Sequence, residues 1–197
     1  GKMFKAISVG SQPIDWKKAL WNFPKGLKVF ISQNTLFKTR PIVGFIHALV
    51  AWGFTLYLIV NVVDVLYGFI PDFHFFSNYF IGKMYRIFVD VFTVLVLVGV
   101  FYFLVRRFIF NDKRLIINKP VMISEEARIG MRNDSLLVGL FILFHVGARF
   151  LSASFEIAKN GVDDFQPAAT TISLLWSNLS SENIILFEHI SWWIALG

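Results

Sequence analysis

Three long stretches of apolar residues dominate the pattern along this chain, with polar segments between them. They run from Ile42 to Leu66, from Tyr85 to Val105 and from Ser135 to Ile157. A helix needs about 20 residues to cross the ~30 Å hydrocarbon core of a bilayer, and each stretch reaches that length. The pattern therefore predicts an all-α membrane protein built as a transmembrane helical bundle.

A fourth apolar stretch begins near Asn183 and ends at Gly197, and its length of about 15 residues is too short to span a membrane. We expect the chain to stop inside a helix at this end. At the other end it starts on Gly1, without an initiator Met or a signal-peptide pattern. The expected bundle has three full spans and the start of a fourth, and it is a fragment of a longer chain.

The first part of the chain has a different pattern, in which bulky apolar side chains alternate with lysines. Such a mixture is typical of amphipathic helices that lie along a membrane surface, and Pro13 and Pro24 are expected to begin them. An ordinary basic linker is the alternative. We therefore divide the chain into an interfacial segment, residues 1–40, and a transmembrane bundle, residues 41–197.

The connecting segments between the spans carry weaker signals. The polar segment 112–133 is broken by Pro120, and a short helix is expected over Ser124 to Gly130. The segment from Asn160 to Glu182 is longer than a turn and contains Leu174, Leu175 and Trp176. We expect this second segment to form an amphipathic cap over the outer end of the bundle.

Composition agrees with a membrane protein, since 56% of the residues are hydrophobic and only 16% are charged. The net charge of +6 does not indicate nucleic acid, because Lys and Arg gather beside the apolar stretches. Eight of these basic residues precede Ile42, and seven lie between Arg106 and Arg132. The excess of positive charge predicts that both segments, including the N-terminal one, are cytoplasmic.

Three of the four histidines, His47, His145 and His189, lie inside apolar stretches. An imidazole in hydrocarbon is unfavourable without a partner, and a chain without cysteine can bind a metal only through His, Met or oxygen ligands. These histidines therefore predict a haem-carrying membrane segment. Histidines that only bridge helices are the alternative, and His74, in a predicted outer loop, is expected to be interfacial.

The depth of each histidine in the membrane predicts which histidines bind the same haem. His145 lies ~15 Å along its helix from the cytoplasmic side and His189 lies ~9 Å from the outer end of its helix, so the two approach one level. His47 lies about 8 Å inside the cytoplasmic end. We expect an outer haem held by His145 and His189, and an inner haem held by His47 with a partner beyond residue 197.

Arg149, one turn after His145, is a costly charge inside a membrane unless it has a partner. A haem propionate would neutralise it and would make Arg149 part of the cofactor site. Asp64 and Asp90, which are also predicted in the outer half, would neutralise it through a buried ion pair. Both possibilities stay open from the sequence.

Several runs of the sequence resemble a known family. LFKTRPIVGFIHALVAWGFTLYLI, DSLLVGLFILFHVGARFLSASFEIAKNG and the terminal FEHISWWIALG resemble the membrane domain of heterodisulfide-reductase-like iron–sulfur oxidoreductases. These include electron-transfer-flavoprotein:menaquinone oxidoreductases, and their membrane domain is similar to the gamma subunit of respiratory nitrate reductase. The resemblance covers residues 25–197, and its most specific part is Arg40-Pro41 with Gly44 and His47.

The resemblance implies a b-type cytochrome, with one or two haem b groups, that passes electrons between a cytoplasmic iron–sulfur partner and the quinone pool. It implies menaquinone or ubiquinone as substrate, an electron-transfer flavoprotein as a further partner, and a bacterial or archaeal cytoplasmic membrane. The chain would then be the membrane part of a quinone-linked oxidoreductase, with its iron–sulfur domain on the same or on another polypeptide.

The resemblance also bears on the individual ligands. It makes His47 the most secure haem ligand, whereas the assignment of His145 rests on the physical argument alone. Relatives place a histidine directly after the tryptophan pair, where this chain has Ile194 and Ala195. Either His189, one turn earlier, has taken over that role or one haem is altered or missing.

Two functions of other classes remain as alternatives. In a non-redox membrane anchor or assembly subunit the histidines would only bridge helices, and the protein would be colourless. In a transporter or channel Arg149, Asp64 and Asp90 would line a pathway. The second is disfavoured, because the sequence shows no broken helices and no inverted repeat.

Overall fold

The computed structural model describes residues 15–33, 37–38, 40–70, 73, 79–110 and 124–196. The regular elements among these residues are all helical. Pro13, His74 and Pro120 lie outside the described residues. The chain divides into two compact units, Gly1–Phe45 and Ile46–Gly197, and each is described by itself below.

The first unit contains α2 (Trp16–Ser32), whose start is fixed by Asp15. The carboxylate of Asp15 accepts a hydrogen bond of 3.0 Å from the backbone N–H of Lys18, as an N-cap residue does. The expectation that Pro24 begins a helix is wrong, because Pro24 lies inside α2. A proline there cannot donate to the Leu20 carbonyl and its ring crowds that carbonyl, yet the helix continues past it.

Three helices in the described part of the chain are long and apolar enough to cross a membrane. They are α4 (Pro41–Phe69), α5 (Phe80–Leu104) with its π-helical extension η1 (Val105–Ile109), and the greater part of α6 (Glu125–Asn160). The predicted all-α membrane protein with three spans is thus confirmed. Each helix extends beyond the predicted apolar stretch at both ends.

The short helix expected over Ser124 to Gly130 forms the first turns of α6. The Ser124 hydroxyl accepts a hydrogen bond of 3.3 Å from the backbone N–H of Ala127, which satisfies one of the free donors at this helix start. A side-chain cap in a polar segment therefore sets the beginning of this spanning helix.

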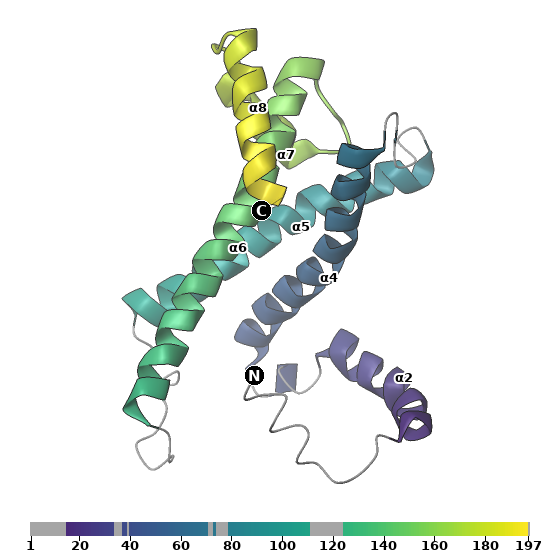
Figure 1. Ribbon diagram of the computed structural model, residues 1–197, viewed down its shortest axis with the longest axis vertical. Coiled ribbons are helices and arrows are strands. Elements are labelled where there is room, and N and C mark those ends of the chain that lie inside the picture. Colours follow the sequence, from purple (N-terminus) through teal and green to yellow (C-terminus); the bar gives the residue numbers. More distant parts are fainter. Residues whose placement is uncertain are drawn as a thin grey trace. The chain divides into compact units, whose positions relative to one another are not determined.

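The segment after α6 folds into α7 (Pro167–Ser173) and the 3-10 turn η3 (Leu174–Trp176), and α8 (Ser181–Leu196) follows. Both α7 and η3 contact α6, as expected for a cap. Ala169 and Ser173 are the buried residues of this segment, whereas Leu174 and Leu175 are exposed. Figure 1 shows α8 beside α6, with the two helices running in opposite directions.

Small and β-branched side chains form the core shared by α4, α5 and α6. A Cβ atom added at Gly99 of α5 would lie 2.6 Å from Cγ2 of Val50 on α4, and one added at Gly53 of α4 would collide with Val96 of α5. Small residues allow such close approach, which is the usual basis of helix packing in lipid. The buried cluster comprises Tyr57, Val60, Val89, Val96, Val100 and Val146.

Candidate functional site

His189 lies on α8 and has the most defined imidazole geometry of the three predicted ligands. Its Nδ1 lies 2.8 Å from the carbonyl oxygen of Ile185, one turn earlier. A carbonyl oxygen can only accept, so Nδ1 carries the proton, and in the neutral imidazole Nε2 then has the lone pair. Metal-binding histidines typically have this arrangement, with one ring nitrogen bonded to a carbonyl and the other available to the metal. The His189 side chain is exposed on α8.

The other two predicted ligands contact aromatic rings. His145 of α6 stacks on Phe141, with ring centroids 5.8 Å apart and the planes inclined by 9°. His47 of α4 is exposed and meets Phe103 of α5 edge-on at 6.3 Å between centroids. In the described ranges no group of three or more His, Asp or Glu side chains is placed to hold a metal ion. The three histidines therefore do not gather at one centre.

His145 and His189 stand at different levels of two packed helices. Ser152 of α6 donates a 3.5 Å hydrogen bond to the carbonyl oxygen of Glu188, and Phe155 meets Phe187 at 5.7 Å between ring centroids. His189 adjoins Glu188, whereas His145 precedes Ser152 by two helical turns, about 10 Å along the axis. The expected pairing of these two histidines across one haem stays a prediction.

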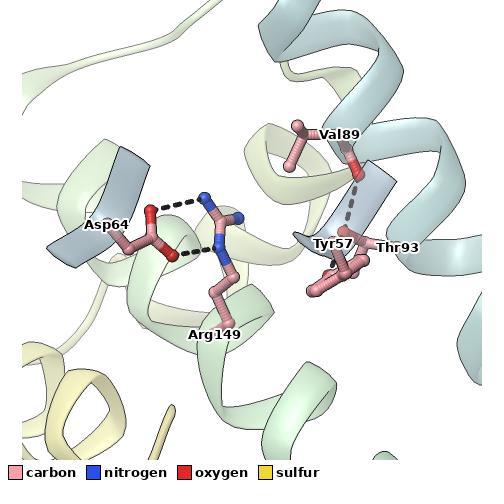
Figure 2. A network of polar contacts seen from close by, with 5 residues as sticks. All are labelled: Tyr57, Asp64, Val89, Thr93 and Arg149. Carbon is pink, nitrogen blue, oxygen red and sulfur yellow. Dashed lines mark hydrogen bonds and ion pairs between the residues drawn. The ribbon is translucent and has the colours of Figure 1, made fainter. Parts of the chain in front are cut away.

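Arg149 forms a bidentate ion pair with Asp64 of α4 (Figure 2). Nε lies 2.7 Å from Oδ2 and Nη2 lies 3.1 Å from Oδ1, and only 19% and 23% of the two side chains are exposed. Such a planar fork is the strongest geometry for an arginine and a carboxylate. The guanidinium is thus paired within the protein, and a haem propionate at Arg149 stays a prediction.

A chain of hydrogen bonds joins α4 to α5 near this ion pair. The Thr93 hydroxyl donates to the carbonyl oxygen of Val89 at 2.6 Å, and the hydroxyls of Tyr57 and Thr93 are 2.6 Å apart. Because the single hydroxyl hydrogen of Thr93 is used on Val89, Tyr57 is the donor in the second bond. Figure 2 shows both contacts beside the Arg149–Asp64 pair.

Asp90 has a role that the sequence analysis missed. The residue is 2% exposed, and its carboxylate accepts hydrogen bonds from the backbone N–H groups of Ala168 at 2.7 Å and Ala169 at 3.0 Å. It therefore caps the start of α7 and joins this cap to α5. Pro167 stands at the first position of α7, where proline is a typical signal of a helix start.

Charged and aromatic side chains fix the same cap at two further points. Nε of Arg86 on α5 lies 3.2 Å from Oδ2 of Asp163, and the guanidinium carbon of Arg86 lies 5.4 Å from the ring centroid of Phe165. On the other side Trp176 donates from Nε1 to the Ser154 hydroxyl at 3.0 Å and stacks on Phe155. The 161–176 segment is therefore held against both α5 and α6.

Among the three predicted ligands, His189 has a ring nitrogen bonded to a backbone carbonyl, while Arg149 and Asp90 have protein partners. Comparison of the chain with protein-family models, with curated proteins and with solved structures found no match.

Proposed function

We propose that this protein is a membrane-bound b-type cytochrome domain, which relays electrons between a cytoplasmic iron–sulfur or flavoprotein partner and the membrane quinone pool. The observation that carries the proposal is the His189 imidazole, whose Nδ1 is fixed on the Ile185 carbonyl and whose Nε2 keeps its lone pair on an exposed face of an apolar helix. The partner and the quinone are proposed because the sequence resembles the membrane domain of iron–sulfur oxidoreductases.

The residues present fit haem b by the chemistry of their donors, because His189, His47 and His145 would offer imidazole nitrogens to its iron. A bound haem would supply an iron centre that accepts and returns one electron. The protein contributes the ligand nitrogens of His189, His47 and His145. These three residues lie on the predominantly apolar helices α4, α6 and α8. The stacked ring of Phe141 restrains the orientation of the His145 imidazole.

Full-length protein, produced with haem available and purified in detergent, tests this function by its reduced-minus-oxidised visible spectrum and by a pyridine haemochrome assay. We expect a b-type signal. His189→Ala should lose at least one haem per chain, whereas His74→Ala, at the fourth histidine, serves as the matched control and should lose none. His189→Met keeps a metal ligand and should retain haem with a shifted spectrum, which a structural role of His189 would not produce.

Quinone linkage needs a separate measurement on the haem-loaded protein. The dithionite-reduced protein, freed of excess reductant, should be reoxidised by menaquinone or ubiquinone analogues. A haem protein that exchanges no electrons with either analogue would contradict the quinone part of the proposal while leaving the cytochrome part intact.

A non-redox membrane anchor or assembly subunit is the second candidate, and the polar contacts inside the bundle favour it. Arg149 is paired with Asp64, and Asp90 is bonded to α7, so both perform structural roles. This function predicts colourless protein even when haem is supplied. The same spectrum therefore separates the two candidates.

A further inference from the structure

One face of α2 is apolar along the whole helix and is fully presented to the surroundings. Successive residues of an α-helix are rotated by about 100°, which places Trp16, Leu20, Phe23 and Leu27 within one sector. Their exposed fractions are 69%, 74%, 66% and 46%, and no residue of α2 is buried. An exposed apolar face of this size typically marks a surface that binds another apolar partner or a membrane.

The opposite sector of α2 is basic. It contains Lys17, Lys18, Lys25 and Lys28, and the helix Trp16–Ser32 has no acidic residue. Trp21 lies among these lysines and is 79% exposed. Long lysine side chains can extend from an apolar surface to polar groups above it, and indole rings favour the layer where hydrocarbon meets headgroups.

We propose that α2 is a binding site for anionic phospholipids. The helix lies in the headgroup layer, its apolar face enters the acyl chains, and its four lysines bind phosphate and other anionic headgroups. Charge complementarity selects this occupant, because a basic sector flanking a continuous apolar one matches an anionic leaflet. The inference does not depend on the proposed redox function, since it uses no cofactor.

Pro24 favours a surface position of the helix. It lies in the middle of α2 and cannot donate a hydrogen bond to the carbonyl of Leu20. In hydrocarbon such a carbonyl is unfavourable, whereas the headgroup layer offers it water. The interior proline thus favours a helix at the surface of the bilayer over one within it.

The absence of native cysteine makes the test direct, since one introduced cysteine can be labelled in the full chain. Leu27→Cys marks the apolar face, and Ser32→Cys marks the opposite face as its matched control. Each variant carries a nitroxide label and is reconstituted in nanodiscs of phosphatidylcholine alone or of phosphatidylcholine with phosphatidylglycerol. Oxygen, which partitions into lipid, and a water-soluble nickel complex report where each label lies.

In the anionic discs the Leu27 label should be reached mainly by oxygen and the Ser32 label mainly by the nickel complex. Each lysine near an anionic surface strengthens binding about fivefold, so the lipid-inserted fraction relative to the free fraction should rise at least about tenfold over phosphatidylcholine discs. High salt should reverse the change, because the attraction is screened.

Two sets of substitutions at the four lysines complete the test. Replacing Lys17, Lys18, Lys25 and Lys28 by Gln should remove the dependence on anionic lipid, whereas replacing them by Arg should retain it. A Leu27 label that is equally protected in both lipids and in the Gln variant would overturn the proposal, because its protection would then not depend on anionic headgroups or on the lysines. A label exposed to water in anionic discs would overturn it as well.

Discussion

The pairing of Arg149 with Asp64 explains how a guanidinium is tolerated inside an apolar bundle. Removing one partner of a buried pair leaves the other charge without compensation, which typically costs about 3–5 kcal/mol. We therefore expect Asp64→Asn and Arg149→Gln each to lower the free energy of unfolding by about 3 kcal/mol. This loss is measured by unfolding the protein in mixed micelles with increasing dodecyl sulfate and following the helix content by circular dichroism.

The double variant Asp64→Asn/Arg149→Gln should be less destabilised than the sum of the two single changes, because no bare charge remains. The matched control is Lys159→Gln, which removes the more exposed partner, with 36% of its side chain exposed, from the 2.6 Å pair with Glu188. That change should cost no more than about 1 kcal/mol. Additive effects of Asp64 and Arg149 would contradict the coupling between them.

Three glycines allow a comparison of close packing with open space. Gly53 abuts Val96 and Gly99 abuts Val50, and both neighbours are stiff β-branched side chains. Gly53→Ala and Gly99→Ala should each lower stability by about 1–3 kcal/mol, because the helices must move apart. Gly130→Ala, in α6 with nothing within 4 Å of the added Cβ, should be neutral or stabilising by up to about 1 kcal/mol. The same unfolding assay compares them.

The ion pair of Arg149 was predictable from the sequence only in part. Hydrophobic context identifies Arg149 as a charge that needs compensation, and it identifies Asp64 and Asp90 as the available carboxylates. It cannot choose between them, because the choice depends on the rotation of α4 and α5 about their axes. The structure resolves it through α7, whose backbone N–H groups occupy Asp90 and leave Asp64 for Arg149.

At the scale of elements, the cap formed by α7 depends on one buried carboxylate. Asp90→Ala removes both acceptors of the Ala168 and Ala169 N–H groups and should weaken the attachment of α7 by about 2 kcal/mol. Hydrogen exchange of these two amides should accelerate by roughly 30-fold, since every 1.4 kcal/mol corresponds to a factor of ten. Asp164→Asn, an exposed acid in the same segment, should leave the exchange unchanged. Equal exchange in both variants would refute this role.

The spanning helices were predictable because each is one long apolar run in the chain, and the structure places a helix over all three. Their ends were not, since they depend on polar residues such as Ser124, whose capping bond begins α6 well before the apolar part. Pro24 was misread for a related reason. Asp15 provides the cap that begins α2, and the helix continues through Pro24 although this proline cannot donate to the Leu20 carbonyl.

At the scale of the whole chain, the relative depths of the histidines could not be predicted from their positions along each helix. The estimate of one common level for His145 and His189 assumed helices that begin at one membrane plane. The contacts of Glu188 with Ser152 and Lys159 instead fix α8 along the far part of α6, above the level of His145. Such axial offsets arise from tertiary packing, which one sequence does not specify.

The direction in which α6 crosses the membrane decides whether the bundle can meet the proposed cytoplasmic iron–sulfur partner. Its 36 residues extend about 54 Å, more than the ~30 Å hydrocarbon core, so both of its ends lie outside that core. We expect a membrane-impermeant maleimide to label Asp164→Cys in right-side-out membranes and Glu126→Cys only in inside-out membranes. Both sites are exposed, and the cysteine-free parent is the blank.

The expected result follows from the basic residues on the Glu126 side, which retain that end of α6 in the cytoplasm. It would leave the 161–176 cap outside and the N-terminal lysines beside the anionic cytoplasmic leaflet. The reverse labelling would put α2 on the outer leaflet and would separate the bundle from any cytoplasmic iron–sulfur partner. The proposed electron route would then lose its donor, whatever the haem content of the protein.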